Sequence, residues 1–211
     1  MNTPRLTAAV VSLALLGALA ACADSASDAA PVATASTATS TSASAQETPA
    51  PSHNDADTSF AQLMTVHHEG AIEMAGLANT NAATQEVVDL GLAISEAQEP
   101  EIESMTWWLD AWGEDSAEHA AMDAGGAMDH AGMVMDGLSH EEAMLELTVL
   151  AGAEFDARFL ELMVAHHEGA VVMAQEEVEG GLNEDAIALA EAIIAAQTAE
   201  IAVMQGMLAT A

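Results

Sequence analysis

Apolar side chains recur every three to four residues along four stretches of the chain, which is the spacing of one face of an α-helix. The stretches are separated by polar or glycine-rich breaks, such as Asn79 to Asn81 and Gly180 to Asn183. No stretch alternates as a β-strand would. The predicted helices span about 58–77, 84–112, 139–178 and 184–208. We therefore predict an all-α fold in which two helical hairpins form a four-helix bundle.

Local signals refine the ends of these helices. A residue at 57–59 can cap the first helix, and Ser139 with Glu142 forms a capping box for the third. Gly113 ends the second helix. Pro100 lies inside that helix and predicts a kink there, because proline removes a backbone hydrogen bond.

The chain contains an internal duplication. The segment FAQLMTVHHEGAIEMA at 60–75 returns as FLELMVAHHEGAVVMA at 159–174, a shift of 99 positions. The register continues, since Gln98, Glu101 and Met105 fall on Gln197, Glu200 and Met204. The two halves are therefore expected to pair about a pseudo-twofold axis, and neither half is expected to fold alone.

Each copy places thioethers and imidazoles on its inward stripe. At about 100° per residue, His67 lies beside Met74 and His68 lies near Met64, so one helix offers two Met/His pairs. The carboxylates at 96–101 are interpreted as a solvated face. The candidate metal ligands are Met64, His67, His68, Met74 and Met105 in the first copy and Met163, His166, His167, Met173 and Met204 in the second.

The N-terminal part predicts export. Residues 1–22 resemble a lipoprotein signal peptide, with Leu19 to Cys22 as the lipobox and Cys22 as the acylated residue. A transmembrane anchor is the alternative, although the apolar run is shorter than the roughly 20 residues that span a bilayer. Residues 23–57, rich in Ala, Ser, Thr and Pro, are predicted to form a disordered linker in which His53 has no role. The bundle domain is then 58–211.

The central segment 114–138 is rich in methionine, histidine and glycine. It is predicted to bind metal more weakly than the bundle and to exchange it faster, because a flexible chain loses conformational entropy when it closes round an ion. The alternative is that its methionines pack as apolar filler. The candidate ligands there are Met133, Met135 and His130, and the wider stretch also holds His119, Met122, Met128, His140 and Met144.

The net charge and the available donor atoms limit which partners the protein can bind. The chain has 34 acidic residues, two basic residues and a net charge of −32, which excludes nucleic acid. Salt adaptation explains such a surface as well as any function does. Thioethers select Cu(I) or Ag(I) over Zn, Mg or Ca, and imidazole extends the choice to Cu(II). With Cys22 the only cysteine, the folded part has no thiolate site.

Several blocks resemble the domain of unknown function family 305, whose members include exported copper-binding proteins of the CopM type. The blocks are the two MxxHHxGAxxMA-like segments, the Gln-x-x-Glu-Ile-x-x-Met segments at Gln98 and Gln197, the Trp107-Trp108-Leu109 end, and GMVMDGLSHEEAMLEL at 132–147. One departure is Val134, where the family often continues a run of methionines. The resemblance covers about Ser59 to Leu208 and implies a ferritin-like bundle, export and Cu(I) or Ag(I) binding.

Three functions follow from these patterns. The first is a lipid-anchored protein that binds Cu(I) or Ag(I), touches the membrane only through its anchor, and sequesters copper or passes it to a partner protein. The second is a metal-free interaction module of the envelope. The third, a di-iron oxidase, lacks the Glu-x-x-His pairs that such sites use. No catalytic motif is present, so the protein is predicted not to be an enzyme.

Overall fold

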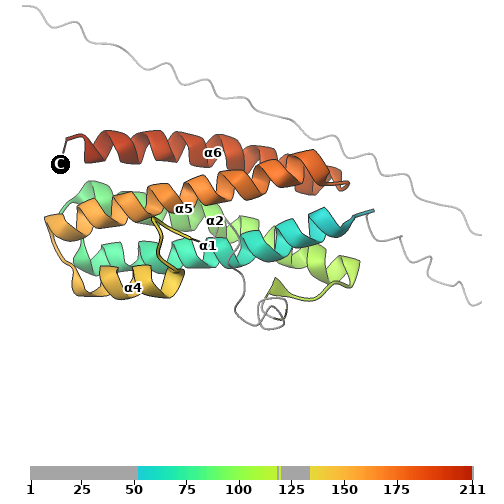
Figure 1. Cartoon of the computed structure of the whole chain (residues 1–211), viewed down its shortest axis with the longest axis horizontal. Helices are drawn as coiled ribbons and strands as arrows, with labels where there is room; N and C mark the ends of the chain where they lie inside the picture. Colours follow the sequence, from blue (N-terminus) through green and yellow to red (C-terminus); the bar gives the residue numbers. More distant parts are fainter. Residues whose placement is uncertain (1–51, 118, 120–133, 211) are drawn as a thin grey trace, which may run out of the picture. The chain divides into compact units, whose positions relative to one another are not determined.

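The computed structural model describes residues 52–117, 119 and 134–210, which form helices and no strand (Figure 1). The helices are α1 (Asp55–Asn81), α2 (Gln85–Trp112), α4 (His140–Val149), α5 (Ala153–Gly180) and α6 (Glu184–Leu208). Short turns join α1 to α2 and α5 to α6, and the two hairpins meet mainly through α1 and α5. The predicted all-α bundle of two hairpins is confirmed. Cys22, and the predicted signal peptide and linker up to residue 51, lie outside the described residues.

The first helix starts earlier than its sequence signals indicated. Asn54 is the N-cap, and its side chain accepts hydrogen bonds from the backbone N–H groups of Ala56 and Asp57. Asp57 is the third helical residue and accepts a hydrogen bond from the Asn54 N–H at 2.6 Å. The prediction of a cap at 57–59 was therefore wrong, because an acidic third residue completes the box that Asn54 opens.

One long predicted helix is two helices in the structure. Ser139 and Glu142 form the predicted capping box, but α4 ends at Val149 and α5 begins at Ala153. Gly152 between them has φ 68° and ψ −145°, and its N–H donates to the Asn81 carbonyl at 2.7 Å. This backbone geometry favours glycine, and it turns α4 back onto the α1–α5 pair.

The second helix runs through Pro100 without interruption. Pro100 is exposed, so the carbonyl left without its intrahelical donor remains within reach of water. The helix ends at Gly113, as predicted, and Gly113 adopts the left-handed conformation (φ 75°).

Two apolar clusters fill the bundle, one toward each end. The Trp cluster contains Phe60, Met64, Met105, Trp108 and Met173, with residues of α6 such as Ile193. The Phe cluster contains Phe155, Phe159, Met74, Met163 and Met204, with Met135 and residues of α4 such as Leu147. Each long helix also carries a buried histidine pair or glutamine between its residues of the two clusters. This polar layer consists of His67, His68, Gln98, His166, His167 and Gln197.

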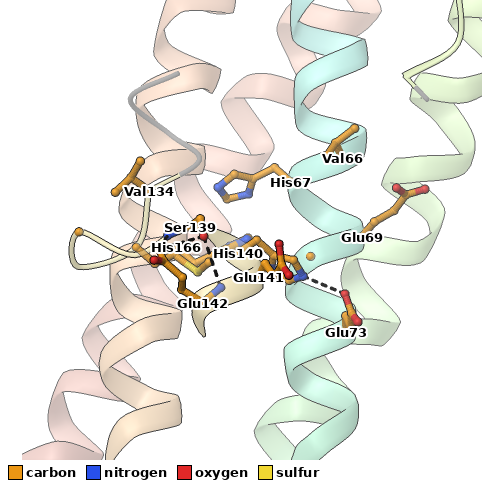
Figure 2. A pocket seen from close by; sticks show the side chains of 13 residues that line it. Val66, His67, Glu69, Glu73, Val134, Ser139, His140, Glu141, Glu142 and His166 are labelled. Atoms are coloured by element: carbon orange, nitrogen blue, oxygen red, sulfur yellow. Dashed lines mark hydrogen bonds and ion pairs between the residues drawn. The ribbon is translucent and has the colours of Figure 1, made fainter. Parts of the chain in front are cut away.

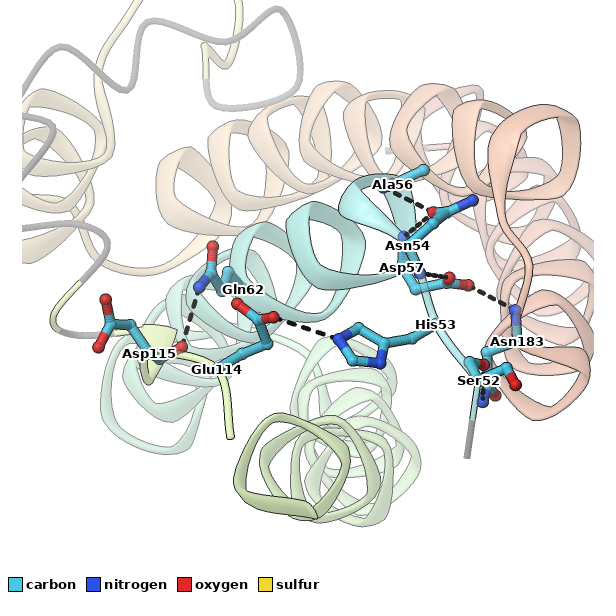
Figure 3. Close-up of polar contacts among 9 residues, drawn as sticks. All are labelled: Ser52, His53, Asn54, Ala56, Asp57, Gln62, Glu114, Asp115 and Asn183. Carbon is cyan, nitrogen blue, oxygen red and sulfur yellow. Dashed lines mark hydrogen bonds and ion pairs between the residues drawn. The ribbon is translucent and has the colours of Figure 1, made fainter. Parts of the chain in front are cut away.

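Reciprocal capping ties the hairpins together. The Asp57 carboxylate on α1 accepts hydrogen bonds from the N–H groups of Leu182 and Asn183, in the turn before α6 (Figure 3). The equivalent Asp156 on α5 accepts from Ala83 and Thr84, in the turn before α2. Each hairpin therefore supplies the carboxylate that satisfies the turn of the other, which follows the predicted pseudo-twofold axis.

The residues before α1 also pack on the bundle. The His53 ring stacks on Trp112 with ring centroids 4.6 Å apart. Its Nε2 atom lies 3.2 Å from Glu114 Oε1 (Figure 3). The prediction that His53 has no role was therefore wrong: it anchors the start of the domain to the end of α2.

Candidate metal centre

The polar layer is built from adjacent histidines on the two central helices. His67 and His68 on α1, and His166 and His167 on α5, are each at most 3% exposed. The rings of His67 and His166 meet between the helices, with centroids 3.6 Å apart and planes inclined at 44°. The second histidine of each pair points toward the partner helix of its own hairpin.

Two carboxylates hold these second histidines in matching ways. His68 Nε2 lies 2.7 Å from Glu101 Oε2, and His167 Nε2 lies 2.6 Å from Glu200 Oε2. A carboxylate only accepts hydrogen bonds, so Nε2 of each ring carries the proton. The Nδ1 atoms of both rings are buried without a hydrogen-bond partner and present a lone pair. A histidine oriented by a carboxylate through one nitrogen is the usual arrangement for metal coordination through the other.

These carboxylates correct the sequence interpretation. Glu96 and Glu99 are exposed as expected, but Glu101 is only 20% exposed and is paired with His68. The spacing of 33 residues between His68 and Glu101 repeats between His167 and Glu200. This repeated spacing is visible in the sequence, and it could have identified Glu101 and Glu200 as partners of the two histidines.

Burial also sets the charge state of His166. It lowers the pKa of His166 well below its ordinary value, and His67, His167, His68 and His140 lower it further. His166 is therefore neutral near pH 7, and one of its ring nitrogens can coordinate a metal without first losing a proton.

The thioethers divide into two symmetry-related sets. Each apolar cluster contains one set, next to the polar layer, and each set draws on three helices. Most of these sulfur atoms belong to fully buried side chains. The first set is Met64, Met105 and Met173, and the second is Met163, Met204 and Met74. Thus the Met64 and Met74 of one helix lie in different clusters.

The polar layer opens on one side into a cavity of 650 Å³ beneath α4 (Figure 2). His67, His166, Met135 and His140 line it. His140 is the first residue of α4, and its Nε2 atom lies 2.8 Å from Glu73 Oε2. Glu73 has no counterpart in the second copy, where Val172 stands, so α4 is bound on one side of the pseudo-twofold axis only.

The central segment is divided between core and surface. Met135 is 1% exposed and belongs to the Phe cluster, so this residue packs as apolar filler, the alternative given for the segment. Met144 is partly buried against the same cluster, while His119 is exposed. Met133, His130 and the remaining central methionines, Met122 and Met128, lie outside the described residues.

The sequence analysis did not identify the three carboxylates that pair with histidines, which are Glu73, Glu101 and Glu200.

Solved structures of related proteins share this fold. Residues 57–208 match the profile of a family described as domain of unknown function (DUF305). A DUF305 protein from Streptomyces coelicolor, named as secreted, is 32% identical with a TM-score of 0.63, over 74% of this chain and 93% of that one. CopM in its Cu(II)-bound form is 32% identical with a TM-score of 0.61, over 73% of this chain and 96% of that one.

CopM in its Cu(I)-bound form is 29% identical with a TM-score of 0.58, over the same shares of the two chains. No curated protein matches this chain. Because the family profile covers nearly all of the four long helices, this protein is a member of the DUF305 family.

Proposed function

We propose that this protein binds Cu(I) or Ag(I) in two equivalent buried sites and holds or transfers copper outside the cytoplasm. Each site is formed by one carboxylate-held histidine and the thioethers beside it. The first site is His68 with Met64, Met105 and Met173, and the second is His167 with Met163, Met204 and Met74. His67 and His166 lie between the two sites.

The observation that carries this proposal is the pair of buried, unpartnered Nδ1 atoms on His68 and His167. Burying an imidazole acceptor without a hydrogen bond costs free energy, and one metal ion bound in each site would satisfy the Nδ1 atom there. Thioether and neutral imidazole donors suit a soft monovalent ion. The Cu(I)-, Cu(II)- and Ag-bound forms of the similar protein CopM support the proposal that this chain binds copper or silver.

Binding fits this site better than catalysis. Among the described residues, no three His, Cys, Asp or Glu side chains gather as a di-iron oxidase requires. A metal-free interaction module would leave the two lone pairs unexplained.

The test is a titration with Ag(I), and with Cu(I) under reducing conditions, against a competing chelator. The wild-type chain should bind two ions tightly. His68→Ala and His167→Ala should each remove one ion, while circular dichroism still reports a helical bundle. Unchanged binding in both variants would show that these histidines are not ligands.

Export and anchoring complete the proposal. The lipobox ending at Cys22 supports acylation there, and the secreted relative supports export. By length and composition alone, α6 could also cross a membrane, so the anchor needs its own test. Cys22→Ala protein should lose incorporated fatty acid and leave the membrane fraction. Continued membrane partitioning of that variant would argue against a lipid anchor.

A further inference from the structure

Gly70 lies opposite two imidazole nitrogens that belong to other helices. A Cβ atom built on Gly70 would lie 3.2 Å from His140 Nδ1 and 3.6 Å from His166 Nε2. The first nitrogen comes from α4 and the second from α5, while Gly70 belongs to α1. The missing side chain therefore leaves a position bordered by nitrogen atoms from two separate helices; Figure 2 shows the two rings, His140 and His166.

The His140 ring is held so that one of its nitrogens is available as a donor. Its Nε2 atom pairs with the Glu73 carboxylate at 2.8 Å and therefore carries the proton. Its Nδ1 atom is buried and has no hydrogen-bond partner. This is the same arrangement that Glu101 gives His68, but here it lies at the wall of an open cavity and not in the bundle interior.

The donors here differ in chemistry from those of the buried sets. Two imidazoles, with a cavity wide enough for water to complete the coordination, suit a borderline divalent ion, and Cu(II) binds such donors most tightly of the first-row divalent metals. Metal–nitrogen bonds are about 2 Å long in imidazole sites. An ion beside Gly70 would draw both nitrogens to that distance while His140 Nε2 keeps its pairing with Glu73.

We infer that His140 and His166 form a third metal site, which takes Cu(II) at the cavity wall and is separate from the two buried Met/His sites. The site occurs once per chain, because Val172 replaces Glu73 in the second copy and α4 covers only one side of the bundle. Cu(II) would reach it through the cavity without opening the helices.

The test compares substitutions in the purified full chain by Cu(II) titration and electron paramagnetic resonance. Wild type should show one Cu(II) with nitrogen hyperfine structure from imidazole. His140→Ala should lose it, and Glu73→Gln should bind it about 10- to 100-fold more weakly, as for other residues that orient a ligand. Gly70→Ala should also lose it, because the added methyl group fills the metal position.

Gly76→Ala is the matched control, since it adds the same methyl group to the same helix where nothing lies within 4 Å. It should behave as wild type. If His140→Ala and Gly70→Ala keep the same Cu(II) count and spectrum, or if Gly76→Ala loses the ion equally, the site is refuted. Ag(I) titration of the same variants reports on the buried sites independently, so the failure of one proposal can be told from the failure of the other.

Discussion

Glu177 on α5 is the equivalent of Ala78 on α1. The second copy therefore has a carboxyl group where the first has a methyl group, and this carboxyl group lies beside Asp57. Burial, hydrogen bonding to Asp57 and the charge of Asp57 raise the pKa of Glu177 to about 8. For Asp57, burial alone would raise the pKa, but its backbone donors outweigh burial and lower it. Glu177 is therefore the group that holds a proton at neutral pH.

The raised pKa predicts how stability changes with pH. Because the folded pKa of Glu177 is about 8 and the ordinary value is 4.5, its contribution is complete below pH 4.5 and is lost as pH rises through 8. The free energy of unfolding should fall across that window by up to about 1.4 kcal/mol per pH unit. Glu177→Gln should remove this slope in urea titrations at pH 5.5 to 9.

The control for that prediction is Glu176→Gln, which neutralises the adjacent, exposed carboxylate. It should keep the wild-type slope. A Glu177→Gln slope equal to that of wild type would mean that Glu177 is ionised in the folded protein at neutral pH.

The carboxylates that hold His68 and His167 give a second prediction at the residue scale. Glu101→Gln and Glu200→Gln keep the shape of the side chain but allow either ring tautomer, so the lone pair on Nδ1 is no longer fixed. Affinity for Ag(I) at the matching site should fall about 10- to 100-fold. The measurement is chelator competition, and Glu99→Gln, on the exposed face of the same helix, should change nothing.

At the scale of elements, Gly152 decides where α4 ends and α5 begins. Its φ of 68° and ψ of −145° lie where only glycine is commonly found, although a methyl group there would meet no atom within 4 Å. The strain of Gly152→Ala is therefore in the backbone alone, and it should lower the free energy of unfolding by about 1–3 kcal/mol. Chemical denaturation measures this loss.

Gly76→Ala, in a regular part of α1 with open space around it, is the comparison for Gly152→Ala. It should raise stability by about 0.5–1 kcal/mol, since alanine is the better helix former. If the two variants changed stability alike, the break before α5 would not depend on a left-handed residue.

Arg158 reinforces the docking of α4 on α5. Its Nε and Nη2 atoms donate to the two carboxylate oxygens of Glu146, at 3.0 and 3.2 Å, and its Nη1 atom donates to Asp136 beside Met135. These bonds raise the pKa of Arg158. The first copy has Ser59 at the equivalent position. The contact of Arg158 with α4 therefore has no counterpart in the first copy, just as the His140–Glu73 pair has none in the second.

For the whole molecule, the reciprocal caps predict that each hairpin depends on the other. Asp156→Ala leaves the N–H groups of Ala83 and Thr84 without their acceptor and should cost about 1–3 kcal/mol. The corresponding fall in Tm is about 2–4 °C per kcal/mol for a domain of this size. Unfolding should remain a single transition, because both hairpins share both clusters.

Asp55→Asn is the control for Asp156→Ala, as it alters an exposed acidic residue in the first turn of α1. It should change Tm by less than Asp156→Ala does. Two separate transitions, seen by calorimetry in the Asp156→Ala protein, would contradict the view that neither hairpin is stable alone.

The sequence alone determined the helical fold, the pairing of duplicated hairpins and the identity of the buried Met and His residues. Those features depend on apolar periodicity and on a repeat of 99 positions, which are visible without coordinates. It also identified the box at Ser139 and the end of a helix at Gly113, because both signals are local.

Only the tertiary structure decided what these residues contact. The pairing of His68 with Glu101 joins different helices, so a helical period cannot reveal it. The division of Met64 and Met74 between two clusters depends on which helices surround α1. The break at Gly152 and the placement of His140 over Gly70 likewise follow from packing of α4 on α1 and α5, which no local preference encodes.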